Sequence, residues 1–146
     1  MESYITISFL PAILNIAGFY NGDKSSLELN TNQSLFENQT VRGAMNFIEE
    51  NYSQDIDVED VARSIHSSYS HLSRLFKKHT GETLSYHLNK VRLVKSQKLL
   101  KCSDKSIAQI AREVGIGNDQ CFCTLFKKVY GIYPGNYRNN IEHFLE

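Results

Sequence analysis

The sequence has no hydrophobic run that makes a convincing membrane span. Its most apolar stretch, residues 4–20, contains Pro11, Asn15 and Gly18, and its 17 residues fall short of the roughly 20 apolar residues that a spanning helix needs. No lysine or arginine precedes the stretch, so a secretory signal would lack its positively charged start. We therefore expect neither a membrane span nor export. Residues 21–40, rich in Asn, Ser, Thr and Gln, have the composition of a linker.

Cysteine is scarce, and the patterns of metal sites and catalytic sites are missing. The three cysteines are an odd number, and Cys121 and Cys123 are too close for a usual bridge, which excludes a disulfide scaffold and fits a reducing cytoplasm. No Cys or His pair has zinc-site spacing, and the five histidines form no catalytic pattern with carboxylates. There is also no phosphate-binding glycine loop and no nucleophile elbow. We therefore expect no metal, no cofactor and no enzymatic activity.

The chain has no net charge, because 16 basic residues balance 16 acidic ones, but the charges are unevenly distributed. Residues 41–60 have one arginine against six acids, whereas residues 61–138 have fourteen basic residues against four acids. The hydrophobic fraction of 41% and the length of 146 residues suit an ordinary globular protein of one domain or two small ones. A basic stretch in such a chain makes nucleic acid the first partner to consider.

Beyond residue 40 the chain shows short helical patterns, and part of it occurs twice at a spacing of about 50 residues. Residues 75–78 (LFKK) recur as 125–128. Each copy combines a short amphipathic helix, a tight polar turn and a second amphipathic helix, which is a helix-turn-helix pattern. Asp57 can cap the first helix of the first copy, and a Ser106…Gln109 capping box precedes that of the second.

These patterns predict an all-α protein with two helix-turn-helix units joined by a long linker helix. At about 1.5 Å per residue the linker helix would span about 27 Å, somewhat less than the roughly 34 Å of one DNA turn. With the width of each unit added, the second helices of the two units could reach successive major-groove segments on one face of DNA. The predicted organisation is an amino-terminal extension or linker over 1–40, a DNA-binding domain over 41–139 and a tail over 140–146, with helix-turn-helix units at about 57–80 and 106–130 and the linker helix at about 84–101, entered through Thr83.

The residues resemble the AraC/XylS family of bacterial transcription regulators. In the second copy the matching residues are Ile107 to Gly115 (IAQIAREVG), Phe122, Phe126 to Lys128, Gly131, Pro134, Tyr137 and Arg138. In the first copy they are Val58, Val61, Ala62, His66, Ser67, Leu72 to Lys78 (LSRLFKK), Thr80, Gly81, Arg92, Leu99 and Leu100. The resemblance covers about 41–139. It implies homeodomain-like three-helix units, double-stranded DNA as ligand, activation of transcription and RNA polymerase as the protein partner.

Three residues depart from the family pattern. Ile116 stands where an aromatic residue usually follows the glycine, and Tyr133 replaces the usual small residue before Pro134. Both affect packing. Thr124 stands where a basic or polar base reader is common, so it could alter which base is read.

Base edges are read by side chains near the start of the second helix of a helix-turn-helix. The positions concerned are Tyr69, Ser70, Ser73 and Arg74 in the first unit and Asn118, Asp119, Gln120, Cys123 and Thr124 in the second. Arg74 can bind guanine O6 and N7 together, unless it is a surface arginine paired with an acid. Gln120 reads adenine or is only solvated, and Asp119, which repels phosphate, is better interpreted as a helix cap.

Eight basic residues are candidates for contacts with phosphate, which position a protein without reading sequence. They are Lys77, Lys78, Lys90, Arg92, Lys95, Lys127, Lys128 and Arg138. Lysines in the last turn of a helix also have a simpler explanation, because cations there balance the helix dipole.

We therefore predict a cytoplasmic, sequence-specific regulator of transcription that binds double-stranded DNA. The alternatives are an interaction module or regulator fragment that has lost independent specific binding, and an enzyme such as a repair protein that carries this domain as an appendage. A monomer already has two DNA-binding units. A homodimer would need the first 40 residues or a domain before them. Because 40 residues cannot enclose a ligand cavity of ordinary size, we expect either a minimal regulator or the carboxy-terminal part of a longer one.

Overall fold

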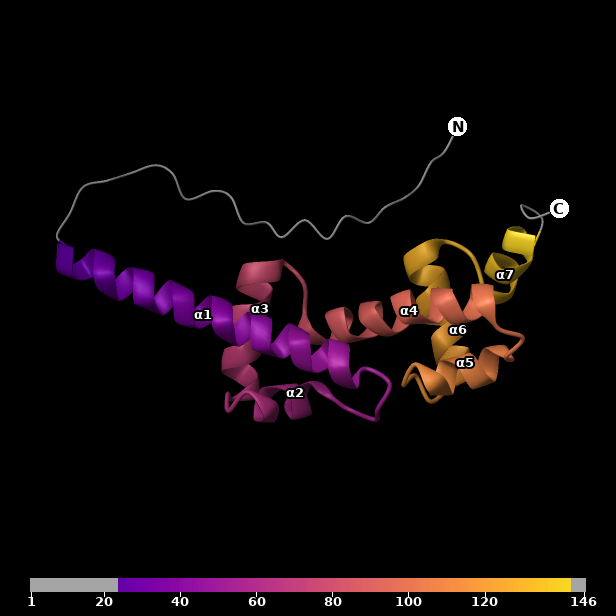
Figure 1. Cartoon of the computed structure of the whole chain (residues 1–146), viewed down its shortest axis with the longest axis horizontal. Helices are drawn as coiled ribbons and strands as arrows, with labels where there is room; N and C mark the ends of the chain where they lie inside the picture. The colour runs from indigo at the N-terminus through magenta and orange to yellow at the C-terminus, as the bar shows by residue number, and fades with distance from the viewer. Residues whose placement is uncertain (1–23, 143–146) are drawn as a thin grey trace, which may run out of the picture.

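The computed structural model describes residues 24–142, and within them the chain forms seven helices and no strand (Figure 1). The helices are α1 (Lys24–Asn51), α2 (Val58–Ser64), α3 (Tyr69–Thr80), α4 (Leu84–Cys102), α5 (Ile107–Glu113), α6 (Asp119–Tyr130) and α7 (Pro134–Glu142). The all-α prediction is confirmed, whereas the expectations for the apolar stretch 4–20 lie outside the described residues. No helix among those described is both long enough and apolar enough to span a membrane.

Helix α1 corrects the expected linker, because residues 24–40 are helical and continue without a break into residues 41–51. No proline or glycine between Lys24 and Thr40 stops the helix, and Val41, Ala44 and Ile48 on its later turns are buried in the core. A composition rich in Asn, Ser and Thr therefore does not predict a linker where the next residues form a packed helix that can extend back through the polar segment. In Figure 1 the first part of α1 extends beyond the helices on which the rest of it packs.

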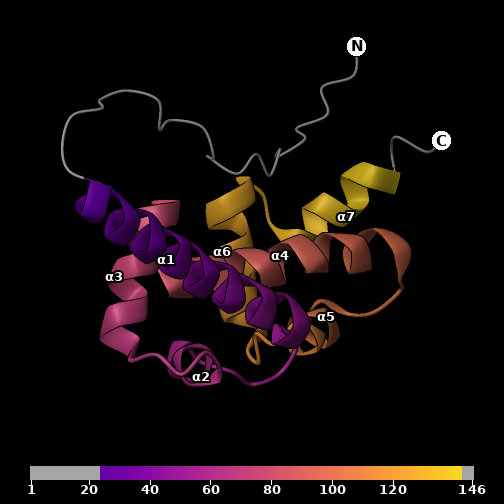
Figure 2. The same cartoon turned by 60° about the vertical axis from the view of Figure 1, so that its left-hand side comes forward.

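The helices form two small units, each with its own hydrophobic core, and α4 contributes to both (Figure 2). The core of the first unit is made by α1, α2, α3 and the start of α4 around Val41, Ala44, Ile48, Val61, Ala62, Leu72, Leu75, Phe76, Leu84, Leu88 and Val91. The core of the second is made by the later part of α4, α5 and α6 around Leu93, Leu100, Ile110, Ala111, Val114, Ile116, Phe122 and Phe126, with Tyr137 of α7 packed against it.

The ends of the helices follow the sequence signals. Asp57 and Asp60 form a capping box at α2, Ser106 and Gln109 form the predicted one at α5, and the Thr83 hydroxyl accepts from the backbone N–H of Tyr86 at the start of α4. A capping side chain accepts hydrogen bonds from backbone N–H groups that have no partner within the helix. These caps fix where each unit's short helices begin.

The two units meet where the end of α1 approaches the turn after α5. The Arg92 guanidinium donates from Nε to the carbonyl oxygen of Tyr52 at 2.8 Å and from Nη2 to that of Gln54 at 3.0 Å. Gly115 in the facing turn has φ +82°, and a Cβ there would collide with the same Tyr52 oxygen. We call this contact of Tyr52, Arg92 and Gly115 the inter-unit clasp, because it joins the segment after α1 to the turn after α5.

Candidate nucleic-acid interface

Helices α3 and α6 are the second helices of the two helix-turn-helix units, and they run in similar directions in both views (Figures 1 and 2). Each buries one face, through Leu72 and Phe76 in α3 and through Phe122 and Phe126 in α6. Because a helical face repeats every three to four residues, the polar residues between these positions point away from the core. The two helices therefore present two polar faces on one molecule.

The four predicted readers of the first unit lie in the first two turns of α3. Tyr69, Ser70 and Arg74 are exposed and Ser73 is half-buried. Ser68 caps the helix by accepting from the backbone N–H of His71 at 3.3 Å. Arg74 takes part in no ion pair within the described part of the chain, so the alternative of an acid-paired surface arginine has no support there.

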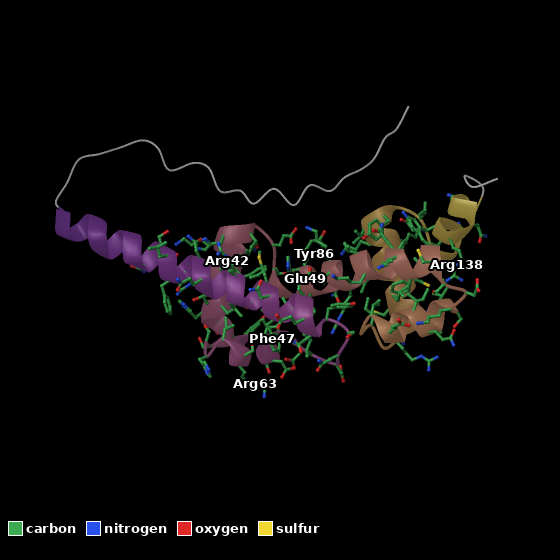
Figure 3. The ribbon with its side chains drawn as sticks, in the orientation of Figure 1. Arg42, Phe47, Glu49, Arg63, Tyr86 and Arg138 are labelled. Atoms are coloured by element: carbon green, nitrogen blue, oxygen red, sulfur yellow. The ribbon has the colours of Figure 1, made fainter. Side chains whose placement is uncertain are left out.

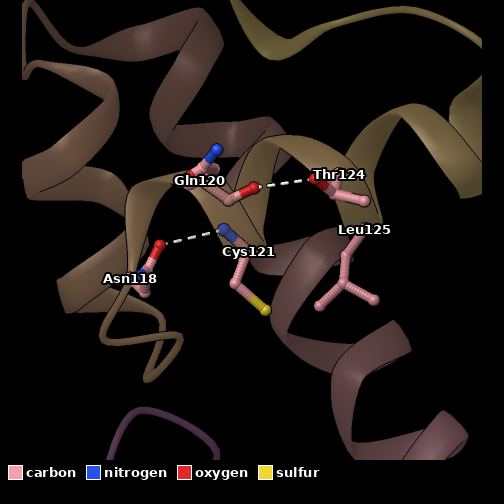
Figure 4. A pocket seen from close by; sticks show the side chains of 5 residues that line it. All are labelled: Asn118, Gln120, Cys121, Thr124 and Leu125. Carbon is pink, nitrogen blue, oxygen red and sulfur yellow. Dashed lines mark hydrogen bonds between the residues drawn. The ribbon is translucent and has the colours of Figure 1, made fainter.

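In α6 several predicted readers bond to their own helix instead (Figure 4). Asn118 is the cap, accepting from the backbone N–H of Cys121 at 3.0 Å, which corrects the expectation that Asp119 caps the helix. The Asp119 carboxylate accepts from the backbone N–H of Gln120 at 2.9 Å, and the Thr124 hydroxyl donates to the Gln120 carbonyl at 2.9 Å. The Gln120 side chain remains exposed, whereas the Thr124 hydroxyl proton is already donated to a carbonyl of its own helix.

The polar side of α6 also borders a shallow surface hollow of about 490 Å³, lined by Asn118, Gln120, Cys121, Thr124 and Leu125 (Figure 4). Sequence reasoning missed Cys121 and Leu125. The sequence could have indicated them, because Cys121 and Leu125 are four residues apart and therefore lie on the same face of a helix. Cys123 is half-buried on α6, and burial raises the pKa of its thiol, which keeps it protonated at neutral pH.

Four of the eight candidate phosphate contacts lie exposed in the last turns of α3 and α6, namely Lys77, Lys78, Lys127 and Lys128. Their settings differ. The Lys127 Nζ lies 4.3 Å from the centre of the Tyr133 ring, a cation–π contact, and Lys78 is paired with Glu37 at 2.9 Å. Lys77 and Lys128 form no ion pair with any residue that the structure describes.

The other four basic candidates have structural partners. Lys90 pairs with Glu82 at 2.6 Å and Lys95 with Glu49 at 2.9 Å. Arg138, which Figure 3 shows on the second unit, donates to the carbonyl of Lys105 after α4 at 2.7 Å and to that of Leu100 in the last turn of α4 at 3.3 Å.

Arg92 requires a correction. It is only 8% exposed and sits in the inter-unit clasp, so the expectation that it contacts phosphate is wrong. Burial lowers the pKa of its guanidinium, but the carbonyl oxygens that accept its hydrogen bonds compensate for the lost water. Sequence alone shows a basic residue and not which carbonyls it will meet.

No group of three or more His, Cys, Asp and Glu side chains in the described range could hold a metal ion. The site that remains is a pair of helices with exposed polar faces and lysines at their ends. Such a surface suits a polyanion that also offers hydrogen-bonding groups, which is the chemistry of a nucleic-acid groove.

Comparisons with known proteins match the part of the chain that contains the two helix-turn-helix units. A family model described as a helix-turn-helix domain matches residues 61–140. The regulatory protein PocR of Salmonella typhimurium is 33% identical over 121 residues, 83% of this chain and 40% of PocR. The HTH-type transcriptional activator RhaS of Salmonella schwarzengrund is 33% identical over 118 residues, 77% of this chain and 42% of RhaS. The chain thus spans about two fifths of these two relatives.

Solved structures with a similar fold belong to the same kind of protein as these relatives. The C-terminal domain of AraT, a response regulator from Geobacillus stearothermophilus, has a TM-score of 0.67 and 35% sequence identity, over 69% of this chain and 84% of that one. The DNA-binding domain of the transcriptional factor AdpA, in complex with a target DNA, has a TM-score of 0.65 and 25% identity, over 68% of this chain and 90% of that one. Two of these four proteins are named as a response regulator and a transcriptional activator, and one was solved on DNA.

Proposed function

Since this chain belongs to the AraC-type family of helix-turn-helix transcription regulators, we propose that it reads double-stranded DNA by placing α3 and α6 in two successive major-groove segments. The family consists of DNA-binding regulators rather than enzymes. The observation that carries the proposal is a pair of helices that run in similar directions (Figure 2) and have exposed polar residues and lysines in their last turns. Base edges in the major groove differ in their donors and acceptors, so two such faces can select a sequence.

The first unit supplies most of the base reading in this proposal. Arg74 is exposed and unpaired among the described residues, and Ser70 and Ser73 lie on the same helical face. In the second unit Gln120 is the principal reader, because the Thr124 hydroxyl already donates within the helix. The remaining proposed readers are Tyr69, Asn118, Asp119 and Cys123, with smaller roles.

Phosphate contacts come from the exposed lysines Lys77, Lys127 and Lys128. These contacts hold the protein in register without reading bases, and they make the affinity depend on salt. In this proposal Lys90, Lys95 and Arg138 keep their partners within the protein and do not contact phosphate. A single chain contains both reading helices and therefore binds one site as a monomer in this proposal.

The protein further acts as an activator in the bacterial cytoplasm, with RNA polymerase as its protein partner. The relative RhaS is named a transcriptional activator, which supports this direction. Transcription by purified RNA polymerase from a promoter carrying the preferred site should rise when the protein is added. No change or a decrease would contradict activation while leaving the DNA-binding proposal intact.

Selection of binding sites from randomised duplex DNA tests the DNA-reading proposal. We expect enrichment of two short half-sites with centres about one helical turn apart. The affinity for the selected duplex and for a scrambled control is then measured at several salt concentrations. Both affinities should fall with salt, and the selected duplex should remain the tighter ligand. No enrichment, with equal affinity for both duplexes, would contradict sequence reading and favour an interaction module.

A further inference from the structure

Two lysines at equivalent positions of the two recognition helices have different surroundings. Lys78 and Lys128 are 50 residues apart, each the last residue of the repeated LFKK sequence, and both are exposed in the last turn of their helix. The Lys78 Nζ lies 2.9 Å from Oε2 of Glu37 on α1. Lys128 forms no ion pair among the residues that the structure describes.

Glu37 is held more firmly than an ordinary surface carboxylate. Its Oε2 atom also lies 3.1 Å from Nε2 of His79, so a single oxygen meets two side chains from the end of α3. The side chain of Glu37 is only 16% exposed, whereas that of Lys78 is 63% exposed, so water and salt still reach this pair from the lysine side. Hydrogen bonds from Lys78 and then His79 lower the pKa of the Glu37 carboxyl. Glu37 is therefore ionised at neutral pH.

Moving Lys78 to a DNA phosphate would exchange one anion for another. The exchange gives up a charge-assisted hydrogen bond and leaves the half-buried Glu37 carboxylate with His79 alone beside it. Lys128 has no such partner to leave. Equivalent positions in the repeat therefore need not make equivalent contributions to phosphate binding.

We propose that Glu37 sets the DNA affinity of this protein by retaining Lys78, so that Lys128 contributes a phosphate contact that Lys78 does not. Glu37 is thus a positioning residue that acts through Lys78 and touches no DNA itself. The proposal rests on the proposed DNA-binding function. It also gives a role to the part of α1 that sequence composition assigned to a linker.

The salt dependence of DNA affinity measures this directly. Each phosphate neutralised in duplex DNA contributes about −0.9 to the slope of log K against log salt. We expect Lys128→Ala to make the slope shallower by about 0.9, and Lys78→Ala to change it by less than half as much. The probe is one selected duplex, bound by the full chain. Equal changes in the two variants would overturn the proposal.

Removing the charge of Glu37 provides the second measurement. In Glu37→Gln, Lys78 is released, so the slope should steepen by about 0.9 and the affinity at low salt should rise. Adding Lys78→Ala to Glu37→Gln should abolish this gain. Because both proteins lack the Glu37 carboxylate, any disturbance of α1 is common to them and cancels in the comparison.

A Glu37→Gln slope equal to that of the unmodified chain, or one that Lys78→Ala does not alter, would overturn the proposal while DNA binding stands. Failure of the unmodified chain to bind duplex DNA with any salt dependence would overturn the proposed function itself. The two failures are therefore distinguishable.

Discussion

Arg74 and Thr124 are equivalent residues of the two recognition helices, 50 positions apart, and the structure separates their roles. The Arg74 guanidinium forms no ion pair within the described chain, whereas the Thr124 hydroxyl donates to Gln120. We expect Arg74→Ala to weaken binding to the preferred duplex by about 1–3 kcal/mol, the size of a bidentate guanine contact. Thr124→Ala should cost less, because the hydroxyl proton is not available to a base.

Titrations of both variants against the preferred duplex and its single-base variants check this prediction. Arg74→Ala should lose its preference at one base pair and bind the variants of that pair equally. A uniform loss across all duplexes, the scrambled one included, would instead identify Arg74 as a phosphate contact. An equal loss of specificity in Thr124→Ala would contradict the assignment of its hydroxyl to the helix.

Sequence reasoning located exposed polar residues at the starts of α3 and α6, but it could not separate basic residues that are free from those that have structural partners. Arg74 and Ser70 follow from helical periodicity and the repeat, both of which are local properties. Arg92 and Lys95 carry the positive charge that a residue needs to bind phosphate. Their partners, however, lie some 40 residues earlier in the chain, at Tyr52 and Glu49. Only the packing of α1 against α4 determines those contacts.

The junction between α3 and α4 contains an acid whose ionisation supports the fold. Partial burial raises the pKa of Glu82, but the hydrogen bonds and charges of Lys90 and His87 on α4 outweigh burial, and the net pKa is lowered. A carboxyl with a lowered pKa stabilises the native state above its unfolded-state value, near 4.5, and that stabilisation is lost as pH falls through the native value. Stability should therefore decline below about pH 5.

Urea unfolding midpoints between neutral pH and pH 3 test this expectation. Glu82→Gln should already be less stable at neutral pH and should decline less steeply in acid, because it lacks one of the linked carboxyls. Glu37 and Asp57 also have lowered pKa values, so part of the decline should remain in the variant. An acid decline in Glu82→Gln as steep as in the unmodified chain would show that Glu82 is not linked to folding.

At the scale of helices, the sequence predicted the features that depend on neighbouring residues and missed those that depend on contacts with distant residues. The caps Asp57 and Ser106 were found because a capping side chain lies within three residues of the N–H groups it binds. The early part of α1 was not found, since its polar composition matches a linker. In the structure, Glu37 in this part of the helix contacts Lys78 and His79, which are more than 40 residues away in the chain. A local sequence pattern does not contain such contacts.

Across the whole molecule, we expect the inter-unit clasp to fix how far apart α3 and α6 lie. Arg92 binds the Tyr52 carbonyl, and Gly115 packs so closely on this oxygen that no side chain fits. Gly131 offers a matched control. It also has a positive φ, +79° against +82°, but a Cβ there would meet nothing within 4 Å. Gly131→Ala should therefore cost about 1–2 kcal/mol from backbone strain alone, and Gly115→Ala more.

The two variants should also differ on DNA. Gly115→Ala displaces the end of α1 from the turn after α5, so the two units should lose their fixed orientation and accept half-sites moved apart by one base pair nearly as well as the selected spacing. Gly131→Ala should keep the original spacing preference. Denaturant unfolding and affinities for the spaced duplexes measure both effects. If Gly115→Ala keeps the spacing preference despite its lower stability, then α4 alone sets the distance between the units, because among the described helices it is the one that contributes to both cores.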